Sequence, residues 1–203
     1  RCAEAMTLFY NKKNLFKLIN GLTVVSFFFA MVLQPTLTFA NPLGGTVVAG
    51  SANISENGNT LIIKQNSKKA VIDWRSFDIG ANEHTQFIQP GSKSLTLNLI
   101  GDTKPSQIDG SLSANGRIIL VNRNGIFFNE NARIDVNSLV ASTAGISADD
   151  FMRNKKLNFD IAGNADAKIV NKGTITAASA GLIGLVAPQV ENQGVIRAKL
   201  GKV

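Results

Sequence analysis

The acidic side chains that could support acid–base catalysis are scattered singly through the sequence. They are Asp73, Asp78, Glu83, Asp102 and Asp109. Enzymes that cleave glycosidic bonds place two carboxyl groups around the same bond. His84 is the only histidine, whereas a metal site needs three or four ligands. We therefore predict no enzyme activity, no metal site and no cofactor.

A basic segment followed by an apolar one opens the chain. Three lysines precede an apolar run over residues 22–33, and Pro35 follows it. This is the order of the n-region and h-region of a secretory signal peptide. The run is shorter than the roughly 20 apolar residues that a transmembrane helix needs. We therefore predict that residues 1–40 are a signal peptide recognised by the Sec machinery and removed on export.

Small residues mark the predicted cleavage site. Thr38 and Ala40 stand three residues and one residue before the cut, and Asn41 becomes the first mature residue. Met6 is the expected start of translation, so residues 1–5 are expected to be translated sequence upstream of it.

The charge of residues 41–203 argues against a nucleic-acid partner. Removing residues 1–40 takes away four of the 21 basic residues and one of the 14 acidic residues, which leaves a net charge of +4. Nucleic-acid binding would favour a concentrated basic stripe with interleaved aromatic residues, and the cations are scattered. The only cysteine, Cys2, lies outside this part, so it forms no disulfide.

Short apolar alternations bounded by glycine and asparagine dominate the mature part. They predict short β-strands at 60–63, 94–97, 117–121 and 125–128. One helical turn or two is predicted within 147–156, because a serine can cap it and two aspartates fall in its first turn.

An internal repeat of 21 residues is the most informative feature of the sequence. The segment 169–177 recurs as 190–198, at an offset of 21 residues throughout. The matched residues that we expect to stack on one another are Ile169, Asn171, Gly173 and Ile175 with Val190, Asn192, Gly194 and Ile196.

A repeat of this length with short strands predicts a β-helix. At about 3.3 Å per residue, 21 residues trace three sides of about seven residues each, with alternate side chains pointing inward. We expect about seven or eight coils. Gly173 and Gly194 are expected to supply positive φ at corners. A looser copy at Phe128, Ala132, Ile134 and Val136 lies 41 residues earlier, which we interpret as two periods.

An ordered series of motifs resembles the two-partner-secretion domain of filamentous haemagglutinin and of the high-molecular-weight adhesins. The series covers residues 41–203 and comprises Asn41–Gly45, Gln65, Trp74–Gly80, Phe87–Gly91, Leu97–Asn98, Ser106–Gly110, Ala114–Gly116, Asn122–Ile126 and Leu139–Thr143. Arg123 stands where the family usually has proline, and the family motif Asn-Pro-Asn-Leu is absent. The absence of the second motif places the chain nearer the adhesin branch.

The resemblance implies an all-β, right-handed parallel β-helix with extra-helical capping strands. It also implies export through an outer-membrane β-barrel transporter whose periplasmic domains bind the chain. The protein would then reach the bacterial surface or the medium by way of the periplasm. Residues 41–203 would be the N-terminal secretion domain of a larger exoprotein whose further coils follow Val203, and a downstream region would contact host cells.

Two roles are open for the turn formed by Asn122, Arg123, Asn124, Gly125 and Ile126. It is a corner of the β-helix, a contact for the transporter, or both. Trp74 and Phe77 are predicted to be cap or core residues rather than a sugar platform. Direct binding of a host surface or glycan is the alternative function, and a polysaccharide-active β-helix enzyme is the second alternative.

Overall fold

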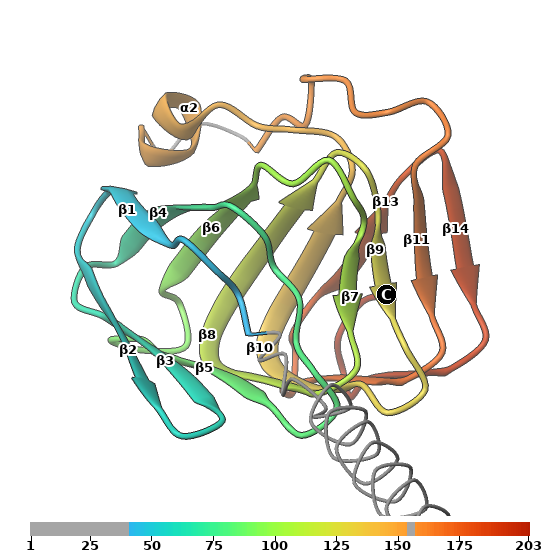
Figure 1. The fold of residues 1–203 in the computed structure, drawn as a ribbon, viewed down its shortest axis with the longest axis horizontal. Helices are drawn as coiled ribbons and strands as arrows, with labels where there is room; N and C mark the ends of the chain where they lie inside the picture. Colours follow the sequence, from blue (N-terminus) through green and yellow to red (C-terminus); the bar gives the residue numbers. More distant parts are fainter. Residues whose placement is uncertain (1–40, 154–156) are drawn as a thin grey trace, which may run out of the picture. The chain divides into compact units, whose positions relative to one another are not determined.

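The strands return, coil after coil, to three parallel stacks around one apolar core (Figure 1). The structure is a computed structural model that describes residues 41–153 and 157–203. The predicted signal peptide and the cleavage residues Thr38 and Ala40 lie outside the described residues. Strands dominate this part, and they form a parallel solenoid of about 6 turns with about 23 residues per turn. The predicted all-β parallel β-helix is confirmed.

Each stack of strands forms one face of the coil. Face A comprises β1 (Thr46–Ala49), β4 (Lys69–Trp74), β6 (Leu95–Ile100), the second halves of β8 (Ser111–Asn122) and β10 (Arg133–Ser142), and β13 (Ile183–Val186). Face B comprises β2 (Ala52–Asn57), β3 (Thr60–Gln65), β5 (His84–Ile88), the first halves of β8 and β10, β12 (Thr174–Ala177) and β15 (Val195–Ala198). Face C comprises β7 (Ser106–Ile108), β9 (Ile126–Phe128), β11 (Lys168–Asn171) and β14 (Gln189–Asn192).

The core forms because alternate residues of each strand point into the coil. Ile63 on face B, Ile72 on face A and Ile126 on face C are all fully buried. Equivalent residues of successive coils lie beside one another, as Ile134 does with Ile175. Burying one such side chain stabilises the fold by roughly 1.5–3 kcal/mol.

The repeat residues lie in the last two coils. Ile169 pairs with Val190 and Asn171 with Asn192 on face C. The Asn171 side-chain amide donates to Asn192 Oδ1 at 2.8 Å, which continues the stack into the side chains. Ile175 pairs with Ile196 on face B.

Two antiparallel strands close the N-terminal end of the coil. β1 pairs antiparallel with β4, and β2 pairs antiparallel with β3. They are the predicted capping strands. Because they occupy the free edges of β3 and β4, the first coil presents no unpaired strand there. Trp74 and Phe77 are buried beneath, with ring centroids 5.5 Å apart in an edge-to-face contact.

The outside of face A carries a second apolar cluster. Val71, Leu97 and Ile119 point outward from neighbouring strands, yet all are buried. Residues 143–153 and 157–167, which we call the excursion, leave the coil and cover them, and helix α2 (Ala148–Met152) contributes Phe151 to the cluster. Ser147 caps this helix, as predicted, by accepting from the Asp150 amide at 3.4 Å.

The coil number differs from the expected seven or eight because two segments lie outside the coils. Residues 143–153 and 157–167 cover face A, and β1 and β2 cap the end. The interpretation of the 41-residue offset as two periods is therefore wrong. Ile134 pairs directly with Ile175, so one turn of the coil contains the whole excursion. Other turns are longer than 21 residues, since Ala70 pairs with Thr96.

Gly173 and Gly194 do not adopt the expected positive φ. A close approach between coils excludes a side chain instead. A Cβ on Gly194 would lie 2.2 Å from the Gly173 carbonyl oxygen, and one on Gly173 would lie 2.6 Å from the carbonyl oxygens of Asn129 and Ala132.

Replacing Gly173 with alanine should therefore lower the free energy of unfolding by about 1–3 kcal/mol, because the preceding coil at Asn129 and Ala132 cannot pack as closely without displacing backbone. Gly91→Ala is the matched control, since a Cβ there meets no atom within 4 Å. Urea unfolding followed by circular dichroism measures both. Equal midpoints for the two variants would show that the coils tolerate the extra atom.

Candidate functional site

The turn after β8 is built by the side chain of Asn122. Asn122 is fully buried, and its Oδ1 accepts from the Asn124 amide at 2.9 Å. The Gly125 amide donates to the Asn122 carbonyl at 3.1 Å, which closes a four-residue turn. Gly125 has φ of +123°, a conformation that favours glycine. The sequence Asn122–Gly125 thus reverses the chain from face A into face C.

This turn also holds the preceding coil. The Asn122 amide group donates to the Lys104 carbonyl at 3.1 Å and to Ser106 Oγ at 3.0 Å. Asn124 Nδ2 donates to the Asp102 carbonyl at 2.7 Å. The side chains of both asparagines are therefore used in joining neighbouring turns, which satisfies carbonyls that no strand pairs.

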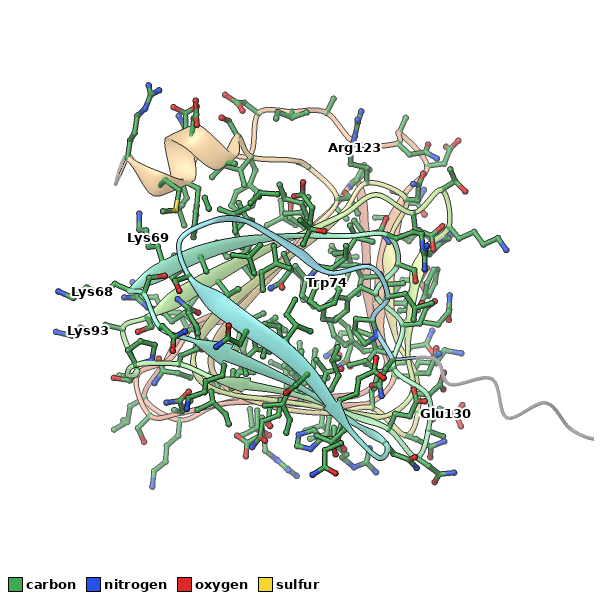
Figure 2. All side chains as sticks on the ribbon, turned by 60° about the vertical axis from the view of Figure 1, so that its left-hand side comes forward. Lys68, Lys69, Trp74, Lys93, Arg123 and Glu130 are labelled. Atoms are coloured by element: carbon green, nitrogen blue, oxygen red, sulfur yellow. The ribbon has the colours of Figure 1, made fainter. Side chains whose placement is uncertain are left out.

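Arg123 connects the same turn to the following coil. Its guanidinium Nη2 donates to the Ala162 carbonyl at 2.8 Å, and its own carbonyl accepts from the Asn164 amide at 2.9 Å. Arg123 is exposed and points away from the coil (Figure 2). Where the family usually has a φ-restricting proline, this chain thus has a side chain that holds the end of the excursion. We name Asp102–Lys104, Asn122–Ile126 and Ala162–Asn164 together the three-coil corner.

Charges gather beside the three-coil corner. Asp78 Oδ1 accepts from the Gln107 amide at 2.7 Å. Burial raises the pKa of Asp78 above its ordinary value, the Gln107 amide opposes this, and the nearby Asp102 charge raises the pKa further. Lys104 lowers the pKa of Asp78 in turn. Asp78 and Asp102 therefore lie near enough for their charges to interact, although the sequence suggested single, separate carboxylates.

The remaining carboxylates and the histidine have structural partners or lie apart. Glu83 Oε2 accepts from the Gly80 amide at 2.9 Å, and Asp109 Oδ2 accepts from Asn129 Nδ2 at 3.0 Å. Asp73 is exposed on β4. His84 Nε2 lies 2.7 Å from Ser113 Oγ, and burial lowers the pKa of His84.

The hydrogen-bonded pair of Ser113 and His84 resembles the nucleophile and general base of a catalytic triad. A carboxylate would have to orient the imidazole to complete the set. Asp135 pairs with Ser113 across β8 and β10, on the side of Ser113 away from β5 and His84. We assign this pair a hydrogen-bonding role on the outside of face B.

A buried polar network joins faces A and B. Gln89 Nε2 donates to Gln65 Oε1 at 3.1 Å and to Thr96 Oγ1 at 3.0 Å. All three side chains are almost fully buried. Asn98 continues the pattern by accepting from Trp74 Nε1 at 3.0 Å and donating to the carbonyl of the next strand. Residues that carry the family resemblance therefore form internal hydrogen bonds.

Neither a metal-binding cluster nor a membrane-spanning helix is found in the part of the chain that the structure describes. No group of three or more histidine, cysteine, aspartate or glutamate residues within 41–153 and 157–203 is placed to hold a metal ion. Within the same ranges, no helix has both the length and the apolar character that crossing a bilayer requires.

The fold and the corner define a parallel β-helix that is capped at its N-terminal end. The chain matches the TPS secretion domain family over residues 39–202. It therefore belongs to the TPS secretion domain family. This confirms the predicted resemblance to two-partner-secretion domains.

Relatives of known structure and name agree with this family. The chain is similar to the HMW1 secretion domain from Haemophilus influenzae, whose crystal structure it matches with a TM-score of 0.68 and 34% identity, covering 77% of this chain and 42% of that one. It is 37% identical over 134 residues to a heme/hemopexin-binding protein of H. influenzae strain Rd, covering 66% of this chain and 15% of that protein. A second heme/hemopexin-binding protein of H. influenzae is 40% identical over 97 residues, 10% of its length.

Sequence reasoning missed two partners of the turn. The Asp102–Lys104 and Ala162–Asn164 segments lie about 20 and 40 positions away, and no periodic pattern marks them. A sequence signal did exist for the covered outer face. The unbroken apolar runs 71–72 and 118–121 indicate strands that are buried on both sides.

Replacing Gln89 with methionine, which has a similar shape, should cost about 1–3 kcal/mol of unfolding free energy, because Gln65 and Thr96 lose a buried donor. Gln86→Met is the matched control, since Gln86 points outward on β5. Chemical denaturation compares the two. A Gln89→Met variant as stable as the control would mean that the buried network is dispensable.

Replacing Arg123 with alanine should loosen the loop at Ala162–Asn164 while leaving the coils intact. Amide hydrogen exchange in residues 161–167 should accelerate about five-fold, corresponding to the loss of about 1 kcal/mol from one hydrogen bond. Arg197→Ala, at an exposed site on β15, is the control. Unchanged exchange in 161–167 would show that the Arg123 side chain does not hold the loop.

Proposed function

We propose that residues 41–203 target a larger exoprotein to its outer-membrane transporter and form the first folded template for it. The observation that carries this proposal is family membership over residues 39–202. The chain spans only 15% and 10% of the named relatives, so the shared part supports a common export role. The heme and hemopexin binding in those names concerns the longer proteins.

The capped coil supports folding that proceeds in one direction. β1 and β2 cover the N-terminal edge, so new coils can add only at the other end. Each coil bonds to its neighbour along the sequence, as Ile175 does to Ile196 after 21 residues. Such near-neighbour contacts let a chain fold as it emerges, without waiting for distant segments. Folding outside the membrane would then disfavour return through the transporter.

The three-coil corner is the surface that we propose for transporter recognition. It presents the exposed side chains of Arg123 and Lys104, while Asn122 is committed to the interior. We further propose that residues 1–40 direct Sec-dependent export and are cleaved between Ala40 and Asn41. On this proposal the mature protein reaches the cell surface or the medium, where regions beyond this domain serve adhesion.

The test is a secretion assay with the full-length exoprotein and its own transporter. Deleting residues 41–203 should abolish release into the medium. Reversing the charges with Arg123→Glu and Lys104→Glu should reduce release by about ten-fold and leave the protein in the periplasm. The reason is that the charges of a recognition surface determine how fast the two partners, here the domain and its transporter, associate.

The matched control reverses two exposed cations on face B, Lys64→Glu and Arg197→Glu. Circular dichroism of the purified variants checks that both pairs fold. If deletion abolishes release but the corner variant is secreted normally, the export role stands and the corner is only structural. If the purified domain binds host cells or glycans and its deletion leaves secretion intact, the adhesion alternative is correct.

A further inference from the structure

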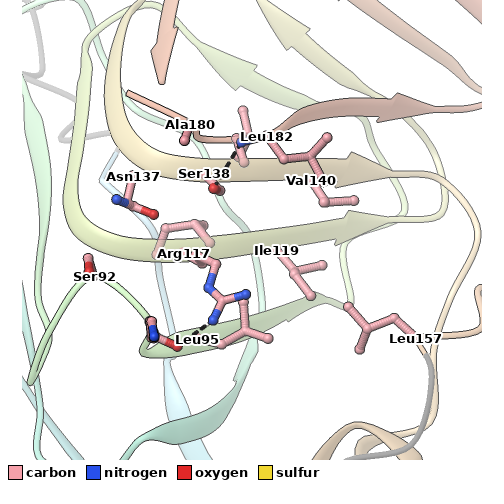
Figure 3. A pocket seen from close by; sticks show the side chains of 13 residues that line it. Ser92, Leu95, Arg117, Ile119, Asn137, Ser138, Val140, Leu157, Ala180 and Leu182 are labelled. Carbon is pink, nitrogen blue, oxygen red and sulfur yellow. Dashed lines mark hydrogen bonds between the residues drawn. The ribbon is translucent and has the colours of Figure 1, made fainter. Parts of the chain in front are cut away.

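A groove opens on the outside of face A beside the second apolar cluster (Figure 3). It encloses about 440 Å³, which lies in the range of small-molecule sites. Its floor is formed by the outward side chains of Leu95, Ile119 and Val140, from three adjacent strands. Leu157 from the excursion lines it as well.

The groove is polar at one end and apolar at the other. Arg117 and Lys93 lie at the polar end, where Arg117 Nη2 donates to the Lys93 carbonyl at 2.9 Å. Ile119, Val140 and Leu157 lie toward the apolar end (Figure 3). None of the 13 lining residues is acidic, so the two cations meet no carboxylate among them.

Neighbouring cations reinforce the charge at this side. Lys68 lies close to Lys93 at the same edge of the molecule, and both side chains point outward (Figure 2). Lys69 is committed elsewhere, because its Nζ donates to the Phe151 carbonyl at 2.6 Å and lies 5.0 Å from the centroid of the Phe151 ring. The exposed cations Lys68, Lys93 and Arg117 therefore favour an anionic group at the polar end.

The strands in the floor cannot accept another strand. β6 pairs with β4 and β8, and β8 pairs with β6 and β10 on this face. The β10 edge is occupied by β13. A ligand therefore cannot bind by adding main-chain hydrogen bonds to a sheet edge, as peptides often do. Apolar contact, an ion pair and hydrogen bonds to side chains such as Ser92 and Asn137 are the interactions that remain.

We propose that this groove binds a single acyl chain with a carboxylate headgroup. The carboxylate pairs with Arg117, whose planar guanidinium can hold two oxygens at once. The hydrocarbon lies over the half-buried Leu95 and Val140 toward the exposed Leu157. A fatty acid matches the groove in both respects, since its charge and its apolar part stand at opposite ends.

Titration of the purified chain with hexanoate, octanoate and decanoate tests this, using calorimetry below the micelle concentration. One molecule should bind per chain. Affinity should rise about four-fold for each added methylene while the hydrocarbon is buried, because each contributes about 0.8 kcal/mol. Octylammonium, which has the same tail and the opposite charge, should bind at least ten-fold more weakly than octanoate.

Two variants separate the two ends of the groove. Arg117→Gln should weaken octanoate binding by about five-fold and reduce its salt dependence. Val140→Thr preserves shape and should flatten the dependence on chain length. Lys64→Gln, a cation on another face, is the control and should bind as the unaltered chain does. Thermal unfolding of each variant confirms that the fold is retained.

Three results would overturn the proposal. They are the absence of saturable octanoate binding, equal binding of octylammonium, and unaltered binding by a folded Arg117→Gln variant. Binding of an acidic amphipathic helical peptide in the absence of alkyl carboxylate binding would also refute it, and would show that the groove takes a protein segment.

Discussion

Hydrogen bonding between the backbones of successive coils is the constraint on which the structure depends. Each coil satisfies its main-chain groups only through the coils before and after it, so the strands must return to the same three stacks. The cap strands β1 and β2 satisfy the first coil. The excursion is tolerated because it leaves after β10 and returns before β11, between two faces, so no ladder is broken.

Side-chain amides extend this constraint to places that strands do not reach. Asn122 and Asn124 bond the carbonyls of the preceding coil, and Asn171 stacks on Asn192. Inside the coil, the Gln89 side-chain amide donates a hydrogen bond to the Gln65 side chain. Buried amides of this kind are favourable only when bonded, so they fix which coils meet. The motifs that identify the family therefore report how the coils close.

The same coil has an outer surface that is partly apolar, and this gives the domain a second layer. Lys69, whose pKa is lowered by burial, and Phe151 attach the excursion to face A. The excursion covers face A only in part, and the groove lies beside Arg117 where this face is left open. One repetitive scaffold thus carries two different surfaces, a polar corner that joins three coils and an apolar groove with a cationic end.

The sequence by itself determined the β-helix, because a 21-residue offset places Ile175 beside Ile196 and periodicity is local information. It also determined the capping serine of α2 and the inward packing of Trp74 and Phe77. Only the tertiary structure decided that the 41-residue offset between Ile134 and Ile175 is one turn. No local sequence feature distinguishes a segment that leaves the coil from a segment that forms one. The tertiary structure likewise decided that Gly173 and Gly194 are required by contact rather than by φ, and that Arg123 holds Ala162, since both depend on which coil lies adjacent.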